Sequence, residues 1–127
     1  MKKIIMSLLG AAALTLFASS AIAGGHKSAA APTTVIHVVT VSWNDDATEA
    51  QIQAALDGVH TLAEEYEGIT RAWTKTIKAQ GNRSHAFVME FKSEKALKDY
   101  AGSDAQKNWY KVYIDARKAS TTFDITN

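Results

Sequence analysis

Two histidines and a tyrosine are the side chains of this sequence best suited to carry chemistry. His37 lies in the segment VIHVVTVSW and His85 lies in SHAFVMEF, each among apolar residues that favour burial. An imidazole can transfer a proton near neutral pH, and a phenol such as that of Tyr100 can donate a hydrogen bond. These residue types allow acid–base catalysis, or recognition of a small ligand in an otherwise apolar cavity.

Other catalytic and metal-binding patterns are missing from the sequence. The chain of 127 residues has no cysteine, which excludes disulfides, cysteine-based zinc sites and thiol nucleophiles. It has no H-x-H or H-E-x-x-H motif, no glycine-rich phosphate loop and no Ser/His/Asp set. Its formal net charge of +1 gives no electrostatic footprint for nucleic acid. We therefore expect no metal, no cofactor and no nucleic-acid partner.

Hydrophobic spacing and cap residues divide the rest of the chain into strands and helices. A strand comes first, and a helix follows that opens on a capping box at Thr48 and ends in a left-handed cap at Gly68. A hairpin, two helices and a last strand complete the order β-α-β-β-α-α-β, which is typical of a ferredoxin-like α+β fold with a four-stranded antiparallel sheet. The expected bounds are 34–43, 48–66, 69–78, 84–91, 93–101, 103–117 and 119–126, with the hairpin loop at 79–83.

This topology predicts where the two histidines lie. The first and third strands are central neighbours, so we expect His37 and His85 close together beneath the helices. Tyr100, Trp109 and Tyr113 on the two later helices would surround them. Such an apolar cavity with a few polar groups suits a small hydrophobic or aromatic ligand. The alternative is that both histidines are core residues, satisfied by backbone carbonyls or by each other.

The first strand also predicts self-association. Val39 and Val41 share one face of it, whereas Ile36 and Val38 share the other. The helices can cover only one face of the sheet, so a second copy packed sheet against sheet is expected to cover the other. The sequence therefore predicts a homodimer formed through the sheet faces.

The first 23 residues have the pattern of a secretory signal peptide. Lys2 and Lys3 precede an apolar run of about 15 residues, and two serines and the small-x-small pattern A-I-A follow it. Because a bilayer span needs roughly 20 residues, we expect cleavage after Ala23 rather than a retained membrane helix. Without Lys2 and Lys3, 12 basic residues stand against 13 acidic ones, so the formal charge becomes −1.

The remaining 104 residues are expected to form one exported domain. Residues 24–33 lack periodicity and are interpreted as a flexible leader, and the domain itself covers 34–126. We expect a periplasmic or secreted protein that has no membrane contact after cleavage.

Several segments resemble the stress-responsive A/B barrel family, often called Dabb proteins. They are the V-x-H opening at Val35, the pattern H-x-x-x-x-x-F-x-S-x-x-A-L-x-x-Y from His85 to Tyr100, and the closing F-D pair at Phe123. The resemblance covers about residues 34–126. It implies a dimeric α+β barrel in which two sheets join across a two-fold axis. It implies less about activity, because most members have undefined biochemistry and fold alone does not fix function.

The cyclase-type members of this family bear on the site. In them an acid–base histidine on the second part of a broken helix works with a tyrosine on the preceding helix, and two strand histidines line the same cavity. By position the strand histidines correspond to His37 and His85, and the tyrosine to Tyr100. The acid–base histidine corresponds to Gln106, which cannot shuttle a proton, and this departure from the family pattern argues against the cyclase reaction. Gln106 also fits a capping box that begins at Ser103.

The sequence thus favours an exported, non-catalytic stress-response or binding protein, a homodimer that holds a small hydrophobic or aromatic ligand. The expected ligand-binding residues are His37, His85, Tyr100, Gln106, Trp109 and Tyr113. One alternative is a polyketide-cyclase- or isomerase-like enzyme in which His37, His85 and Tyr100 transfer protons. The other is a structural or interaction module whose cavity is filled by its own side chains.

Overall fold

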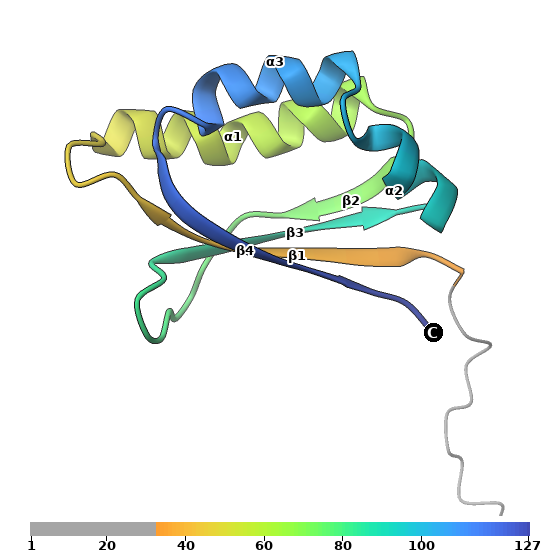
Figure 1. Cartoon of the computed structure of the whole chain (residues 1–127), viewed down its shortest axis with the longest axis horizontal. Helices are drawn as coiled ribbons and strands as arrows, with labels where there is room; N and C mark the ends of the chain where they lie inside the picture. Colours follow the sequence, from red (N-terminus) through yellow and green to blue (C-terminus); the bar gives the residue numbers. More distant parts are fainter. Residues whose placement is uncertain (1–32) are drawn as a thin grey trace, which may run out of the picture.

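The computed structural model describes residues 33–127, and these form a four-stranded antiparallel sheet with three helices against one face (Figure 1). The predicted signal peptide and nearly all of the predicted leader lie outside the described residues. The elements are β1 (Val35–Trp43), α1 (Glu49–Glu65), β2 (Ile69–Trp73), β3 (His85–Phe91), α2 (Glu94–Tyr100), α3 (Asp104–Tyr113) and β4 (Arg117–Ile125). This order confirms the predicted ferredoxin-like fold.

The strands lie in the order β2-β3-β1-β4, so β1 and β3 are central and β2 and β4 are the edges. β1 pairs with β3 from Val35–Phe91 to Val41–His85, and all of the pairings are antiparallel. Within residues 33–127 no helix has both the length and the apolar character needed to cross a bilayer.

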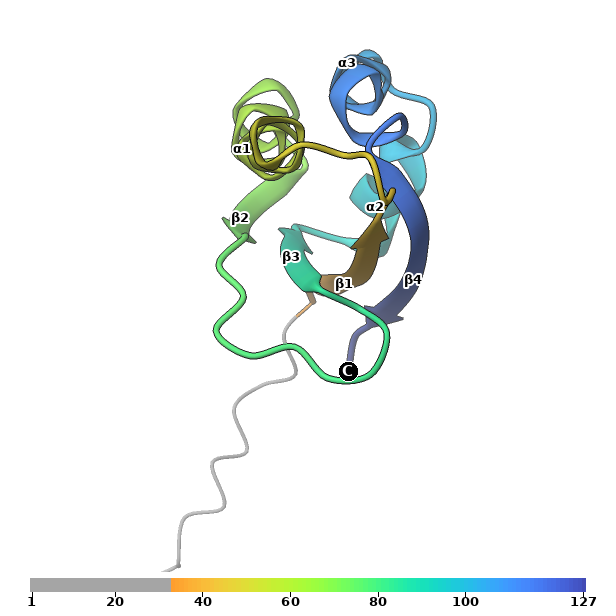
Figure 2. The same cartoon turned by 90° about the vertical axis from the view of Figure 1, so that its left-hand side faces the viewer.

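The alternation of β1 places the core as the sequence predicted. Val39 and Val41 are 4% and 0% exposed, whereas Ile36 and Val38 on the opposite face are only half-buried. α1 and α3 lie side by side over the buried face (Figure 2). The large aromatic side chains of this core are Trp43, Phe87, Phe91, Tyr100, Trp109 and Tyr113.

β2 is shorter than the sequence predicted. It ends at Trp73 rather than at residue 78, so the connection to β3 covers residues 74–84 instead of 79–83. In this connection the Thr76 hydroxyl accepts a hydrogen bond from the Ala86 N–H at 2.8 Å and donates one to the Ala86 carbonyl at 3.1 Å. A side chain thus satisfies the backbone groups that a longer β2 would have paired.

α3 is shorter than predicted, and β4 is longer. The helix ends at Tyr113, and β4 begins at Arg117, where the sequence predicted the end of the helix. Asn44 explains the early end, because its backbone N–H donates to the Ala116 carbonyl and its Nδ2 to the Asp115 carbonyl, both at 2.8 Å. These carbonyls therefore pair with the loop after β1 instead of with a further helical turn.

The glycine that follows α1 has a different role from the one predicted. Among the described residues, positive φ occurs at Gly81 and Gly102, at 68° and 79°, but not at Gly68, so the predicted left-handed cap there is wrong. α1 ends at an extended Tyr66, whose N–H donates to the Leu62 carbonyl. A Cβ at Gly68 would lie 2.3 Å from Cε1 of Tyr66, so glycine is needed here for space.

Within residues 33–127 no helix covers the second face of the sheet (Figure 2). This face carries an apolar row. Strand register aligns Phe123 with Val38, Val38 with Val88, and Val88 with Trp73. Phe123 is 57% exposed and Trp73 is 47% exposed. Apolar side chains that are half-buried on the central strands and exposed on the edge strands thus adjoin one another on this open face.

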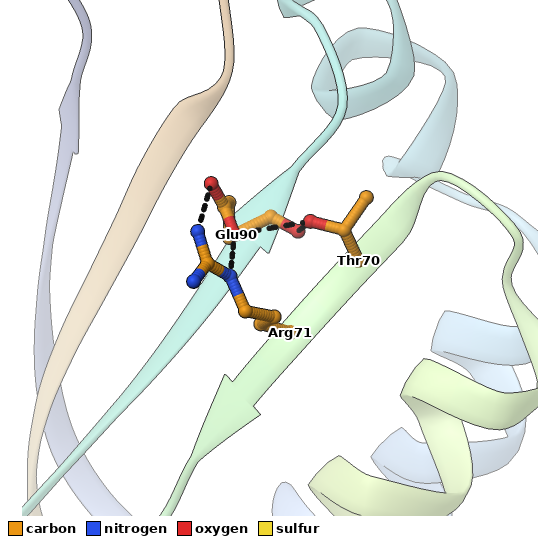
Figure 3. A network of polar contacts seen from close by, with 3 residues as sticks. All are labelled: Thr70, Arg71 and Glu90. Carbon is orange, nitrogen blue, oxygen red and sulfur yellow. Dashed lines mark hydrogen bonds and ion pairs between the residues drawn. The ribbon is translucent and has the colours of Figure 1, made fainter. Parts of the chain in front are cut away.

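The neighbouring row of the open face holds an ion pair on two adjacent strands. Glu90 on β3 is 5% exposed, and its carboxylate accepts hydrogen bonds from Arg71 Nη2 at 3.0 Å, from Arg71 Nε and from the Thr70 hydroxyl at 3.2 Å (Figure 3). The hydrogen bond from Arg71 is the main reason that the pKa of Glu90 falls from 4.5 to about 2, and desolvation opposes it. Glu90 therefore stays ionised on the sheet surface.

Replacing Glu90 with glutamine is expected to remove part of the loss of stability in acid. Because the folded-state pKa is depressed, the ion pair stabilises the fold above pH 4.5, and that contribution is lost as the pH falls toward about 2. Urea unfolding across this window should therefore show a smaller decrease for Glu90→Gln than for the wild type. Glu67→Gln is the matched control, because its side chain is 96% exposed, and it should behave like the wild type. Equal decreases for all three proteins would contradict the prediction.

Candidate functional site

A small cavity of about 100 Å³ lies between the sheet and the two helices that follow β3. Its lining residues are His37, Val39, Phe87, Tyr100, Gln106, Trp109, Tyr110, Tyr113, Arg117, Ser120 and Thr122. Five of the six predicted ligand-binding residues are among them, and His85 is the exception. The structure thus brings together predicted residues from β1, α2 and α3 around one cavity.

His37 is held by a carboxylate at one end of the cavity. Its Nδ1 lies 2.5 Å from Oδ1 of Asp124, and the register of β1 and β4 places these two residues directly opposite each other. Because a carboxylate only accepts hydrogen bonds, Nδ1 carries a proton, and Nε2 is the ring nitrogen that can act as a base. The ring also packs edge-on against Phe91 and Tyr100, at centroid distances of 5.7 and 6.3 Å.

His85 lies away from the cavity, so the predicted proximity of the two histidines is wrong. In the register of β1 with β3, His85 lies opposite Val41, whereas His37 lies opposite Met89. The two histidines are therefore offset by four residues along the strands, which is about 13 Å. His85 Nδ1 accepts a hydrogen bond from Trp43 Nε1 at 2.9 Å, and the two rings pack edge-on at 5.8 Å. His85 is therefore paired with an indole and not with His37 or a backbone carbonyl.

Gln106 lines the cavity, but its polar atoms are engaged within the protein. Its backbone N–H donates to Ser103 Oγ at 3.2 Å, which confirms the N-cap of the predicted capping box but not its second half, because the Gln106 side chain does not bond the Ser103 N–H. Its Oε1 accepts from the Gly102 N–H at 2.7 Å, and its Nε2 donates to Tyr110 Oη at 3.2 Å. Gln106 therefore fixes the start of α3 and contributes no acid–base group to the cavity.

Trp109 and Tyr113 form a rigid wall of the cavity. Their rings are stacked, with centroids 4.3 Å apart and planes inclined by 10°, and Phe87 packs edge-on against Trp109 at 5.5 Å. Trp109 Nε1 donates to the Ala55 carbonyl of α1 at 2.9 Å. The indole N–H is therefore not available to a ligand.

The Tyr113 hydroxyl is buried without a hydrogen-bond partner, and no other buried side-chain polar atom in residues 33–127 is in this state. Burial raises the pKa of Tyr113. The side chains of Ser120 and Arg117 oppose that rise, which places both of them near the hydroxyl. Burial also raises the pKa of Tyr100, so both phenols are protonated and can donate a hydrogen bond.

A wider hollow of about 640 Å³ lies outside this cavity, between the start of β1 and α2. It is shallow, and charged side chains such as Glu94 and Lys98 line it beside Leu97. The predicted site residues do not converge there, so we place the candidate site in the smaller cavity. Within residues 33–127 no group of three or more His, Asp or Glu side chains is arranged to hold a metal ion.

Residues 35–127 match the family model of the stress responsive A/B barrel domain, and they span most of the chain. This chain is a Dabb protein. The match confirms the resemblance that the V-x-H, His85–Tyr100 and F-D segments indicated. No curated protein matches the chain.

Solved structures share the fold of this Dabb protein at low sequence identity. The hydroxynitrile lyase from Passiflora edulis aligns with a TM-score of 0.67 and 15% identity, over 76% of this chain and 94% of the enzyme. A Dabb family protein with a ferredoxin-like fold from Mesorhizobium loti gives 0.62 and 14%, over 74% and 96%. A dimeric ferredoxin-like protein of unknown function from Bacteroides fragilis gives 0.61 and 15%, over 75% and 97%. These similarities show the fold alone.

Sequence reasoning missed two charged residues of this Dabb cavity region. Asp124 belongs to the F-D pair that indicated the family, but its contact with His37 depends on the register of β1 with β4. Arg117 fell at the end of the helix predicted over 103–117, whereas the structure places it at the start of β4 beside Tyr113. The one sequence signal for the true position of Arg117 was the alternation of residues 119–126. Extending that strand pattern by two residues toward the N-terminus would have placed Arg117 on the strand.

Proposed function

We propose that this Dabb protein is a homodimeric binding protein that holds a small polar ligand in the cavity between its sheet and helices. The Tyr113 hydroxyl carries the proposal, because it is buried, lacks a partner and belongs to a residue that lines the cavity. Leaving such a donor unsatisfied costs about 1–3 kcal/mol. A ligand with an acceptor atom next to this hydroxyl would recover that free energy.

The volume of the cavity favours a ligand smaller than the sequence suggested. A dry cavity that admits benzene has a volume of about 150 Å³, whereas this one has about 100 Å³. The aromatic side chains Trp109 and Tyr113 occupy much of the space that an aromatic ligand would need. We therefore propose a ligand of only a few non-hydrogen atoms in place of an aromatic or polyketide-like one.

The open face of the sheet supports a homodimer. The row from Phe123 through Val38 and Val88 to Trp73 is apolar on all four strands, and two copies packed face to face would bury it. Neighbours of the same fold are described as dimeric, among them proteins from Bacteroides fragilis and Thermobifida fusca. We propose the same kind of self-association for this chain, through this face.

Export is part of the same proposal and rests on the signal-peptide pattern of the first 23 residues. We propose that the working protein begins at Gly24 and acts in the periplasm or outside the cell.

One measurement, native mass spectrometry of protein recovered from the bacterial periplasm, tests these proposals together. The expected species is a dimer of 104-residue chains that begin at Gly24 and carry a small additional mass on each protomer. Tyr113→Phe should lose that mass, because the variant no longer offers the buried hydroxyl. A wild-type protein without added mass would contradict the binding function, and a chain of 127 residues would contradict export.

Two variants test the proposed dimer interface separately. Val88→Lys places a charge in the middle of the apolar row, which the proposed interface would bury, and is expected to give monomers at micromolar concentration. Val112→Lys is the matched control, because Val112 is 41% exposed on α3, away from the open face, and the dimer should persist. A monomeric wild type, or a dimeric Val88→Lys protein, would contradict this interface.

Proton transfer on a small carbonyl compound is a second candidate function, favoured by the His37–Asp124 pair. The carboxylate orients the imidazole so that Nε2 is the basic nitrogen of a residue that lines the cavity. Exchange of the α-hydrogens of small ketones in deuterated water would detect this activity. We expect His37→Ala to abolish it and His60→Ala to leave it unchanged, because His60 is bound to Thr74 outside the cavity. No exchange above the buffer rate in the wild type would leave binding as the function.

A further inference from the structure

We propose that the ligand of this cavity is a small carboxylate, held by the Arg117 guanidinium and the Tyr113 hydroxyl. The inference rests on the proposed function and names the chemical class of the molecule that the cavity binds.

The charges around the cavity favour an anion. Its lining contains one permanently charged side chain, that of Arg117, and no aspartate or glutamate. The carboxylate of Asp124 does not line the cavity, and it is bound to His37, which does. A ligand inside the cavity would therefore meet the positive charge of Arg117, whereas the negative charge of Asp124 is already engaged by His37.

Arg117 has no carboxylate partner among the described residues. The six ion pairs within residues 33–127 all involve other side chains. Arg117 Nη1 donates to Ser120 Oγ at 3.3 Å, and its guanidinium carbon lies 5.4 Å from the centroid of the Tyr113 ring. A guanidinium carries five N–H donors, so most of them are free to bind an acceptor.

The hydroxyl and the guanidinium together form a two-point site for a carboxylate. Tyr113 lies at the end of α3 and Arg117 at the start of β4, and the contact between ring and guanidinium holds the two donors on the same side of the cavity. A carboxylate can accept from both donors at once, and hydrogen bonds between charged groups are the stronger kind. A neutral alcohol or amide would satisfy Tyr113 but leave the charge of Arg117 without a counterion.

The rest of the cavity restricts the size and character of this anion. Val39, Phe87 and Trp109 offer apolar surface on which a hydrocarbon tail can pack, and which an inorganic phosphate would not use. A volume of about 100 Å³ is smaller than the cavity of about 150 Å³ that admits benzene, so it suits a carboxylate of about two or three carbons.

A titration with propionate and its neutral analogue propionamide tests the proposal. The indole N–H signal of Trp109 in the ¹⁵N spectrum of the dimeric protein is the reporter, because Trp109 lines the cavity. The indole of Trp73, on the open face of the sheet, is the internal reference. We expect propionate to shift the Trp109 signal in a saturable manner and to leave that of Trp73 in place, with propionamide binding at least tenfold more weakly.

Two variants and a matched control assign the binding to the two donors. Arg117→Gln and Tyr113→Phe should each weaken propionate binding about tenfold or more, with circular dichroism confirming that both are folded. Lys118→Gln removes the same charge one residue away, from a side chain that pairs with Asp45, and should change the affinity less than twofold. Equal weakening by Arg117→Gln and Lys118→Gln would overturn the assignment to Arg117.

The outcomes separate this inference from the proposed function. Equal binding of propionate and propionamide would overturn the carboxylate class and leave a site for small polar ligands. No saturable shift of the Trp109 signal with either compound would overturn both proposals.

Discussion

Replacing Trp109 with alanine is expected to lower the free energy of unfolding by about 3–5 kcal/mol. The side chain is 6% exposed, and it packs between the stacked ring of Tyr113 and the edge of Phe87. Its indole N–H also donates to the Ala55 carbonyl, so Trp109 joins α3 to α1 both by packing and by a hydrogen bond. Removing it leaves a large cavity between the helices and takes away the hydrogen bond that joins them. Urea unfolding followed by circular dichroism measures the effect.

Two further variants separate the contributions of Trp109. Trp109→Phe keeps most of the packing and removes the hydrogen bond, so it is expected to cost about 1–2 kcal/mol. Val112→Ala truncates a 41% exposed residue of the same helix, and it should change the free energy of unfolding by less than about 1 kcal/mol. A Trp109→Ala protein as stable as Val112→Ala would contradict the role of the indole in joining the two helices.

The sequence predicted those parts of the fold that depend on neighbouring residues. The capping box at Thr48 and the N-caps at Ser93 and Ser103 are present as expected, because each joins residues three apart. The alternation along β1 identified Val39 and Val41 as buried, since the side chains of a strand point to opposite faces in turn.

The parts that the sequence did not predict depend on residues far apart in the chain. Alternation of apolar and polar residues gives the face of the sheet on which a strand residue lies, but it does not give the register of that strand with its neighbour. His37 and His85 were assigned correctly to the helix face, and the register then separated them along β1. The partner of His37 is Asp124, 87 residues away, a pairing that no local pattern contains. The candidate site was therefore predictable in its aromatic lining and unpredictable in its charges.

Gly68→Ala is expected to lower the free energy of unfolding by about 2–4 kcal/mol, through steric overlap and a lost hydrogen bond. The new Cβ would lie 2.3 Å from Cε1 and 2.9 Å from Cζ of the Tyr66 ring, so the ring must move. Movement is costly, because the Tyr66 hydroxyl donates to the Ala96 carbonyl of α2 at 2.7 Å and its ring packs against Tyr100 at 5.8 Å. The substitution thus loosens α2 from the end of α1, which chemical unfolding of the variant measures.

A double-mutant cycle distinguishes this steric cause from a backbone one. In a Tyr66→Ala background the ring is absent, so adding Gly68→Ala should cost less than about 1 kcal/mol. Gly102→Ala is the contrasting control, because Gly102 has a φ of 79° and nothing within 4 Å of its added Cβ. Gly102→Ala is expected to lower the free energy of unfolding by about 1 kcal/mol through the backbone conformation alone. This decrease should be the same whether or not the Tyr66 ring is present. If the cost of Gly68→Ala were likewise unchanged by Tyr66→Ala, the Tyr66 ring would not be the reason that glycine occupies position 68.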